Sequence, residues 1–264
     1  MGNLVKMDFY RMFRSKAFII SNIIIFISGI LGKVAELLLY NLSVQMAKES
    51  EEMAASITEY SYTADLSDIF INPFWISMLL IVVLVSAVSF SYADIANGFI
   101  KNIAGQVKKK GHTVISKFIV LCVHNLIFFC VAALGRIAGQ FVIGGNFKID
   151  AADMPIGIGT FICKWLLLQA LCTIILFIST GLKNKTLASV VGVILGSGSL
   201  MILHLMIDGR VKQFVDINLS DFDPSVLIQG SAGFMFANAI GVSLVVIAIF
   251  LSLTVSIFNK SDVK

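Results

Sequence analysis

The sequence predicts an all-α membrane protein, on the evidence of its composition, the length of its apolar segments and the placement of its charged residues. Hydrophobic residues make up 58% of the 264 residues, and charged residues make up 14%. Soluble domains contain about 45–50% apolar and about 25% charged residues. The composition therefore excludes an ordinary soluble enzyme or binding domain.

Six apolar segments are each long enough to cross a bilayer. A hydrocarbon core of about 30 Å requires about 20 helical residues. Backbone polar groups in lipid must be satisfied within the segment, and these segments lack the alternation of barrel strands, so we expect helices. The expected spans are residues 17–40, 72–93, 117–143, 157–182, 186–207 and 233–258. Together they form a single transmembrane domain that covers residues 1–264.

The charged residues orient these spans, because Lys and Arg beside a span are retained on the cytoplasmic side. The segments rich in bases are 1–16, 94–117, 183–185 and 259–264. The segments rich in acids are 41–71, 144–156 and 208–232. We therefore expect both termini in the cytoplasm and a multi-pass protein of the plasma membrane. The net charge of +4 reflects this topology and does not indicate nucleic-acid binding.

The sequence predicts neither a metal site nor a bound cofactor. The cysteines lie inside predicted spans without a C-x-x-C pair, so neither a disulfide framework nor a zinc site is indicated. They are Cys122, Cys130, Cys163 and Cys172. The chain has no G-x-x-x-x-G-K-[ST] motif, so we expect that it does not bind or hydrolyse ATP by itself.

Two short patterns concern helix packing and the N-terminus. The pairs Gly135/Gly139 and Gly192/Gly196 have the G-x-x-x-G spacing that allows close helix approach. Residues 3–14 have the pattern of a helix that lies in the membrane interface. Its apolar residues share one helical arc, and they are Val5, Phe9, Met12 and Phe13. The alternative is a basic flank that only fixes the orientation.

The segment between the second and third spans carries the functional argument. Four apolar residues recur there at every fourth position and define one face of a short helix; they are Ile95, Phe99, Ile103 and Val107. A helix with such a face at the cytoplasmic surface requires a partner. The alternative is a basic anchor, since this segment also holds Lys108, Lys109 and Lys110.

This segment and the N-terminus resemble the permease subunit of type-2 ABC transporters. The resemblance rests on Asp94, Asn97, Gly98, residues 100–103, Gly105, Ser116 and Lys117, with support from residues 6–16. The chain departs from the family at residues 108–110, where relatives often carry a Ser-Arg pair. The order of elements agrees over the whole chain, whereas residue-level similarity is confined to these two segments.

The resemblance implies a six-span subunit of a bacterial-type ABC exporter, with an N-terminal elbow helix and a cytoplasmic coupling helix between spans 2 and 3. The coupling helix would dock on a separate cytoplasmic ATPase subunit, which would hold ATP and Mg. The partners implied are this ATPase, a second permease copy in a homodimer or heterodimer, and membrane lipids, with no nucleic acid. Amphipathic or antimicrobial peptides are the leading substrates, and lipids, glycans or drugs are the alternatives. The implied ATPase-coupling residues are Asp94, Asn97, Gly98, Phe99, Lys101, Asn102, Ile103 and Gly105.

Charged residues within the spans are candidates for a translocation path, because ions inside a membrane are costly. The candidates are Glu36, Arg136 and Lys164. If Lys164 points inward, it would favour anionic substrate groups or close an outer gate by pairing with Glu36. The alternative is a lipid-facing lysine whose long side chain reaches the headgroups.

Two other function classes compete with the exporter. One is a solitary channel or secondary carrier, which would usually place acids or broken helices at mid-membrane. The other is an intramembrane serine protease, suggested by Ser197 and Ser199 with His124 or His204. His204 follows the serines on the same predicted helix, which is poor geometry for a serine and its base.

Overall fold

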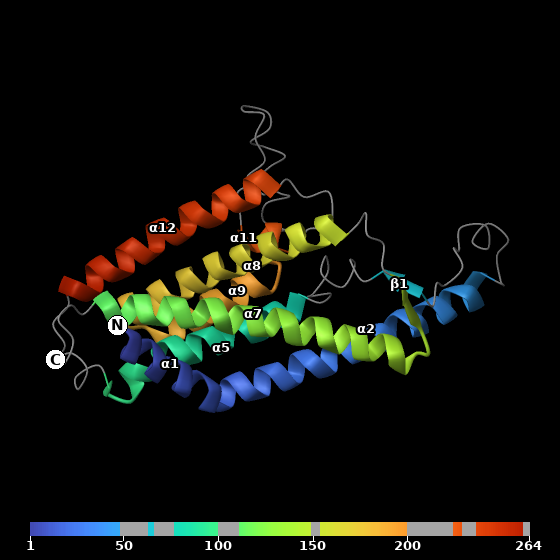
Figure 1. Cartoon of the computed structure of the whole chain (residues 1–264), viewed down its shortest axis with the longest axis horizontal. Helices are drawn as coiled ribbons and strands as arrows, with labels where there is room; N and C mark the ends of the chain where they lie inside the picture. Colours follow the sequence, from blue (N-terminus) through green and yellow to red (C-terminus); the bar gives the residue numbers. More distant parts are fainter. Residues whose placement is uncertain are drawn as a thin grey trace.

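The computed structural model of the chain is a bundle of long α-helices that run side by side (Figure 1). It describes residues 1–47, 63–65, 77–99, 111–148, 154–199, 224–228 and 236–260. Within these ranges, the β-structure is one parallel pair of short strands, β1 (Thr63–Asp65) and β2 (Asn146–Lys148). The sequence did not predict this pair.

Five described helices are long and apolar enough to cross a membrane. They are α2 (Lys16–Ala47), α5 (Ser77–Ala96), α7 (Gly111–Val142), α8 (Met154–Leu176), which the π-helical turn η1 (Phe177–Gly181) extends, and α12 (Phe236–Lys260). Each corresponds to a predicted span, with bounds that differ by several residues. The prediction of an all-α, multi-pass membrane protein is confirmed.

Three shorter helices complete the described structure. They are α1 (Gly2–Arg14), α9 (Lys185–Gly196) and α11 (Pro224–Leu227). The continuous helix expected over residues 186–207 is not observed, because α9 ends at Gly196 and a turn follows at Ser197 and Gly198. Gly198 has a φ of 72°, which lies outside the helical range. Residues 200–207 of that predicted span lie outside the described residues.

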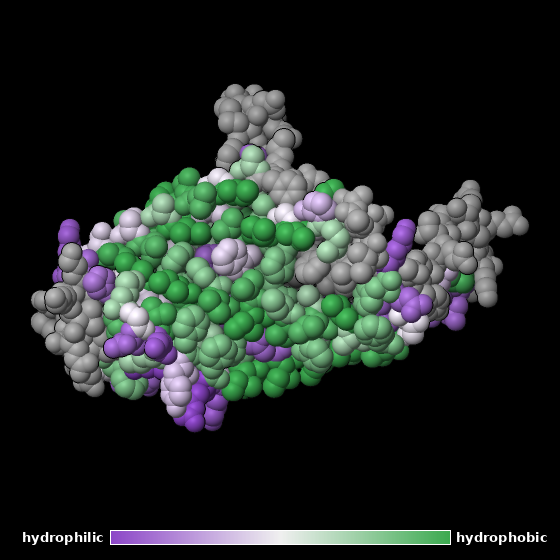
Figure 2. Space-filling view, in the orientation of Figure 1, coloured by the Kyte–Doolittle hydropathy of each residue, from purple (hydrophilic) through white to green (hydrophobic). Residues whose placement is uncertain are grey.

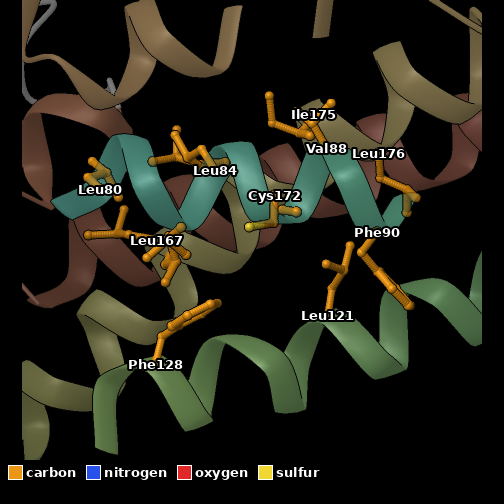
Figure 3. Packing of buried hydrophobic residues seen from close by; sticks show 14 of the residues in the cluster. Leu80, Leu84, Val88, Phe90, Leu121, Phe128, Leu167, Cys172, Ile175 and Leu176 are labelled. Atoms are coloured by element: carbon orange, nitrogen blue, oxygen red, sulfur yellow. The ribbon is translucent and has the colours of Figure 1, made fainter. Parts of the chain in front are cut away.

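The core of the bundle lies where α5 packs against α7, α8 and α9. Leu84, Leu121 and Leu167 are fully buried, and Figure 3 shows such side chains from α5, α7 and α8 pointing toward one another. The outer faces of α2 and α12 are apolar and exposed instead, for example at Ile23 and Leu244. Figure 2 shows this apolar surface along the flank of the bundle. Lipid is the solvent that such a surface requires.

Glycine allows two helix pairs to approach closely, as the sequence pattern predicted. A Cβ atom on Gly135 of α7 would lie 2.6 Å from the Phe26 carbonyl oxygen of α2. A Cβ atom on Gly196 of α9 would lie 2.8 Å from the Ile81 Cα atom of α5. Each glycine therefore places the two backbones in direct contact.

We expect Gly135→Ala to lower the melting temperature, because the added methyl group forces α2 away from α7 at a cost of about 1–3 kcal/mol. The measurement is thermal unfolding of the purified protein in detergent. Gly241→Ala on α12 is the matched control, because a Cβ atom there meets nothing within 4 Å. Equal melting temperatures for both variants would contradict the close packing of α2 on α7.

Candidate functional site

Five helix ends meet at one end of the bundle. The Gly111 N–H at the start of α7 donates to Asn259 Oδ1 in the last turn of α12, at 2.7 Å. α1 and the last turn of α5 lie at the same end (Figure 1), and Thr180 of η1 contacts the Ser91 carbonyl of α5 there. We call this the α1 end, and we call the opposite end, where β1 and β2 pair, the strand end.

Asp94 is buried at the α1 end, between three helices. It lies in the last turn of α5 and is 4% exposed. Its Oδ1 accepts a hydrogen bond from Arg11 Nη1 of α1 at 2.7 Å. Its Oδ2 lies 3.2 Å from Lys117 Nζ of α7, which is 1% exposed. The carboxylate therefore joins α1, α5 and α7 through two ion pairs.

Asp8 provides a second contact between α1 and α7. It is 1% exposed, and its Oδ2 accepts a hydrogen bond from Ser116 Oγ at 2.5 Å. Burial, partly offset by the Ser116 hydrogen bond, raises the pKa of the Asp8 carboxyl above its ordinary value, and the nearby Asp94 raises it further. The cluster thus holds two acids, Asp8 and Asp94, and two bases, Arg11 and Lys117.

The Ser91 carbonyl connects this cluster to η1. Lys117 Nζ donates to that oxygen, and so does Thr180 Oγ1 of η1 at 3.1 Å. The Ser91 carbonyl lies one turn before Asp94, so Lys117 contacts the end of α5 at two points. We call Asp8, Arg11, Asp94, Ser116, Lys117 and Thr180 the junction cluster.

The chain turns directly after Asp94. Asn97 and Gly98 form an exposed turn, and Gly98 has a φ of 68°, which only glycine adopts readily. Ile95 therefore belongs to α5, and the predicted helical face that joined Ile95 to Phe99 is wrong at this point. Phe99 is 40% exposed, and the Arg11 guanidinium carbon lies 4.2 Å from the centre of its ring.

The other residues proposed for ATPase coupling lie outside the described part of the chain. They are Lys101, Asn102, Ile103 and Gly105. The structure therefore shows where the segment between α5 and α7 leaves the bundle, at Asp94 and Phe99, and where the chain re-enters it, at Ser116 and Lys117.

A second polar network lies deeper in the bundle. Ser86 Oγ of α5 and His124 Nε2 of α7 are 3.2 Å apart, and His124 Nδ1 is 3.2 Å from Asn125 Oδ1. Asn125 Nδ2 then donates to Gln169 Oε1 of α8 at 2.7 Å. These side chains are at most 2% exposed, so no substrate could reach the serine. Their arrangement holds α5, α7 and α8 in register and does not support a protease.

The two serines considered for a protease are hydrogen-bonded to each other. Ser197 Oγ donates to Ser199 Oγ at 2.9 Å, and both are exposed in the turn after α9. His204 lies outside the described residues. Within the described part of the chain, no group of His, Cys, Asp and Glu side chains could hold a metal ion.

Glu36 and Arg136, two of the path candidates, contact each other near the strand end. Arg136 Nη2 donates to Glu36 Oε1 at 3.4 Å, between α7 and α2. Lys33 Nζ donates to the other oxygen of Glu36 at 2.8 Å. The described ion pairs of Glu36 are therefore made with Lys33 and Arg136, within the contact of α2 with α7.

Lys164 lies within the bundle. It is 3% exposed on α8, beside the buried Thr160, which is one turn earlier. This burial favours the inward-pointing interpretation over a lysine that faces lipid. A cation buried in a membrane span is a candidate functional residue.

Sequence reasoning missed most of the junction cluster. Asp8, Arg11 and Lys117 were interpreted as parts of charged flanks that fix the topology, although Ser116 and Lys117 contributed to the family resemblance. The signal for the deeper network was present, because His124, Asn125 and Gln169 are polar residues within apolar runs. Compared with models of known protein families and with curated proteins, the sequence matches none.

We expect Asp94 and Lys117 to be strongly coupled in stability. Lys117→Met should lower the free energy of unfolding by about 3–5 kcal/mol, because it leaves part of a buried acid uncompensated. The double variant Asp94→Asn/Lys117→Met should lose less than the sum of the single losses. Reversible unfolding in mixed micelles measures each term, and additive losses would contradict a direct pair.

The raised pKa of Asp8 predicts a specific pH dependence. The folded state holds the Asp8 proton more tightly than the unfolded state does. Protonated Asp8 therefore contributes fully to the free energy of unfolding below about pH 4, and this contribution is lost as pH rises through the folded-state pKa. Asp8→Asn keeps an acceptor for Ser116 and carries no charge. We expect it to be at least as stable as the wild type at pH 7.5, with a smaller pH dependence.

Melting temperatures between pH 5 and 8 test this expectation. Asp8→Leu is the control, because it removes the acceptor for Ser116 and should be less stable than Asp8→Asn at every pH. A large loss of stability in Asp8→Asn at pH 7.5 would show that the folded state needs the ionised carboxylate.

We expect Lys164 to require a positive charge for its function. If the expectation of an ATP-driven exporter holds, Lys164→Met should impair substrate-stimulated ATP hydrolysis and export in reconstituted complexes, whereas Lys164→Arg should largely retain both. Wild-type behaviour of both variants would remove Lys164 from the path candidates.

Proposed function

We propose that this protein is the permease subunit of an ATP-driven exporter of the type-2 ABC class. In this proposal the chain crosses the plasma membrane six times, with both termini in the cytoplasm. A separate cytoplasmic ATPase binds ATP and Mg and supplies the energy. Two permease copies, identical or different, form the translocation path. Amphipathic or antimicrobial peptides are the proposed cargo, for export or self-immunity.

The junction cluster is the observation that carries this proposal. It lies where the segment proposed to bind the ATPase leaves α5 and returns into α7. Asp94 precedes that segment and Lys117 follows it, and the two are 3.2 Å apart. Arg11 adds α1, the proposed elbow helix, to the same contact. A force on the segment would therefore act on α1, α5 and α7 together.

The burial of the cluster supports this mechanical role. Ion pairs shielded from water resist separation more strongly than exposed pairs, which contribute about 0–1 kcal/mol. A displacement of the loop is then transmitted as a tilt of helices and is not absorbed at the joint. The deeper network of Ser86, His124, Asn125 and Gln169 keeps α5, α7 and α8 together during that movement.

The arrangement of helix ends supports the proposed topology. The α1 end contains the start of α1 and the last turn of α12, as expected for an even number of crossings (Figure 1). The basic residues of α1, the start of α9 and the last turn of α12 gather there, which favours the cytoplasmic side. α9 lies within the proposed fifth span, whose residues 200–207 lie outside the described part of the chain.

The test is the loss of the ATPase subunit from the purified native complex. The double variant Phe99→Asp/Ile103→Asp should insert normally but release the ATPase, because a carboxylate buried at a contact costs several kcal/mol. The control is Phe99→Leu/Ile103→Leu, which keeps an apolar surface and should retain the ATPase. The permease alone should show no ATP hydrolysis.

An intact, active complex with Phe99→Asp/Ile103→Asp would contradict the coupling role and favour the basic anchor. Substrate transport by the purified permease alone, without any ATPase, would instead identify a channel or secondary carrier.

A further inference from the structure

We propose that the outward face of α1 and the adjoining flank of α2 form a binding site for one anionic phospholipid. The site would hold the phosphate headgroup at the corner between the two helices and the acyl chains along α2. This inference requires only that the protein lies in a membrane, and it does not depend on the proposed transport function.

The headgroup half of the site is a stripe of cations around a phenol. Lys6, Tyr10 and Arg14 are spaced by four residues, so they share one face of α1, and all three are exposed. The Arg14 guanidinium carbon lies 5.1 Å from the centre of the Tyr10 ring, and Nη1 donates to the Tyr10 hydroxyl. Tyr10 thereby positions the guanidinium, which can bind phosphate with two parallel hydrogen bonds.

The charge of this face is not balanced locally. Asp8 is the acid of α1, and it is buried on the opposite face with Ser116. The next acid along the chain is Glu36, which contacts Lys33 and Arg136 near the strand end. Along the described helices α1 and α2, Lys6, Arg14 and Lys16 thus present three cations without an acid on the same face, which complements a lipid that carries net negative charge.

The acyl half of the site is a row of exposed apolar side chains on α2. They follow Lys16 at helical spacing, and they are Ile20, Ile24, Ile27 and Leu31, with exposures of 55%, 40%, 48% and 59%. Phe13 of α1, 51% exposed, adjoins the corner and packs edge-on against Phe18. Figure 2 shows hydrophilic atoms that project at this corner, directly beside the apolar flank. Cations followed by an apolar row match the shape of a phospholipid.

An anionic lipid fits this corner better than a zwitterionic lipid does. Both carry a phosphate, but a choline headgroup also brings a cation beside Lys6 and Arg14. Each basic residue near the surface favours an anionic lipid about five-fold. The exposed aromatic ring of Tyr10 suits the interface region, where amphipathic rings concentrate.

The test is native mass spectrometry of the full-length protein, from micelles that contain equal amounts of dioleoyl phosphatidylglycerol and dioleoyl phosphatidylcholine. The wild type should retain phosphatidylglycerol over phosphatidylcholine with at least about ten-fold preference. Lys6→Gln/Arg14→Gln should reduce that preference at least about five-fold, because two cations are lost. Lys6→Arg, which keeps both charges and the Arg14 guanidinium, should retain it.

The matched control is Lys183→Gln/Lys185→Gln, which removes two exposed cations from the same end of the bundle. It should change the preference less than about two-fold. Equal losses in the α1 variant and this control would overturn the proposal in favour of a diffuse positive surface. No preference in the wild type, or a change of oligomeric state without a change in lipid retention, would also overturn it.

Discussion

The carboxylate of Asp94 forms ion pairs with cations from two other helices, and these contacts determine how the helices pack at the α1 end of the bundle. A buried carboxylate is tolerated only when cations compensate it. Arg11 and Lys117 do so at the two carboxylate oxygens, Oδ1 and Oδ2, at 2.7 and 3.2 Å. Loss of either cation would leave charge without compensation where water is excluded. α1 must therefore stay docked on the bundle, and α5 must end beside the start of α7.

The two faces of α1 have different tasks as a result. Its inward face, with Asp8, Arg11 and the buried Met12, belongs to the protein interior. Its outward face, with Lys6, Tyr10 and Arg14, is exposed. Farther along the bundle, backbone contacts at glycine replace ion pairs as the means of holding helices together, as between α7 and α2. A membrane protein gains little from burying apolar surface against lipid, so such polar and close contacts determine its packing.

Most of the fold could be predicted from the sequence, because the length of an apolar segment and the need to satisfy backbone groups leave few alternatives. The interruption after Gly196 was not predicted, because the Gly-Ser-Gly-Ser run at residues 196–199 fits either a helix-packing surface or a turn, and tertiary context decides between the two. The site was predicted only in part. Asp94 was identified through the family resemblance and Phe99 through the apolar period of its segment. The pairing of Asp94 with Arg11 and Lys117, in contrast, joins residues 83 and 23 positions away. No spacing rule connects such residues, and lysine at the start of a span has a sufficient explanation in topology.

The most direct measurement is hydrogen exchange of the protein, alone and bound to the ATPase subunit that we propose as its partner. Binding at the proposed coupling segment should slow exchange together in α1, in the last turn of α5 and in the first turns of α7, because Asp94 links them. In Asp94→Asn, the slowing should be confined to the segment between α5 and α7. Slowed exchange at the strand end instead, or an unchanged pattern in Asp94→Asn, would contradict the account.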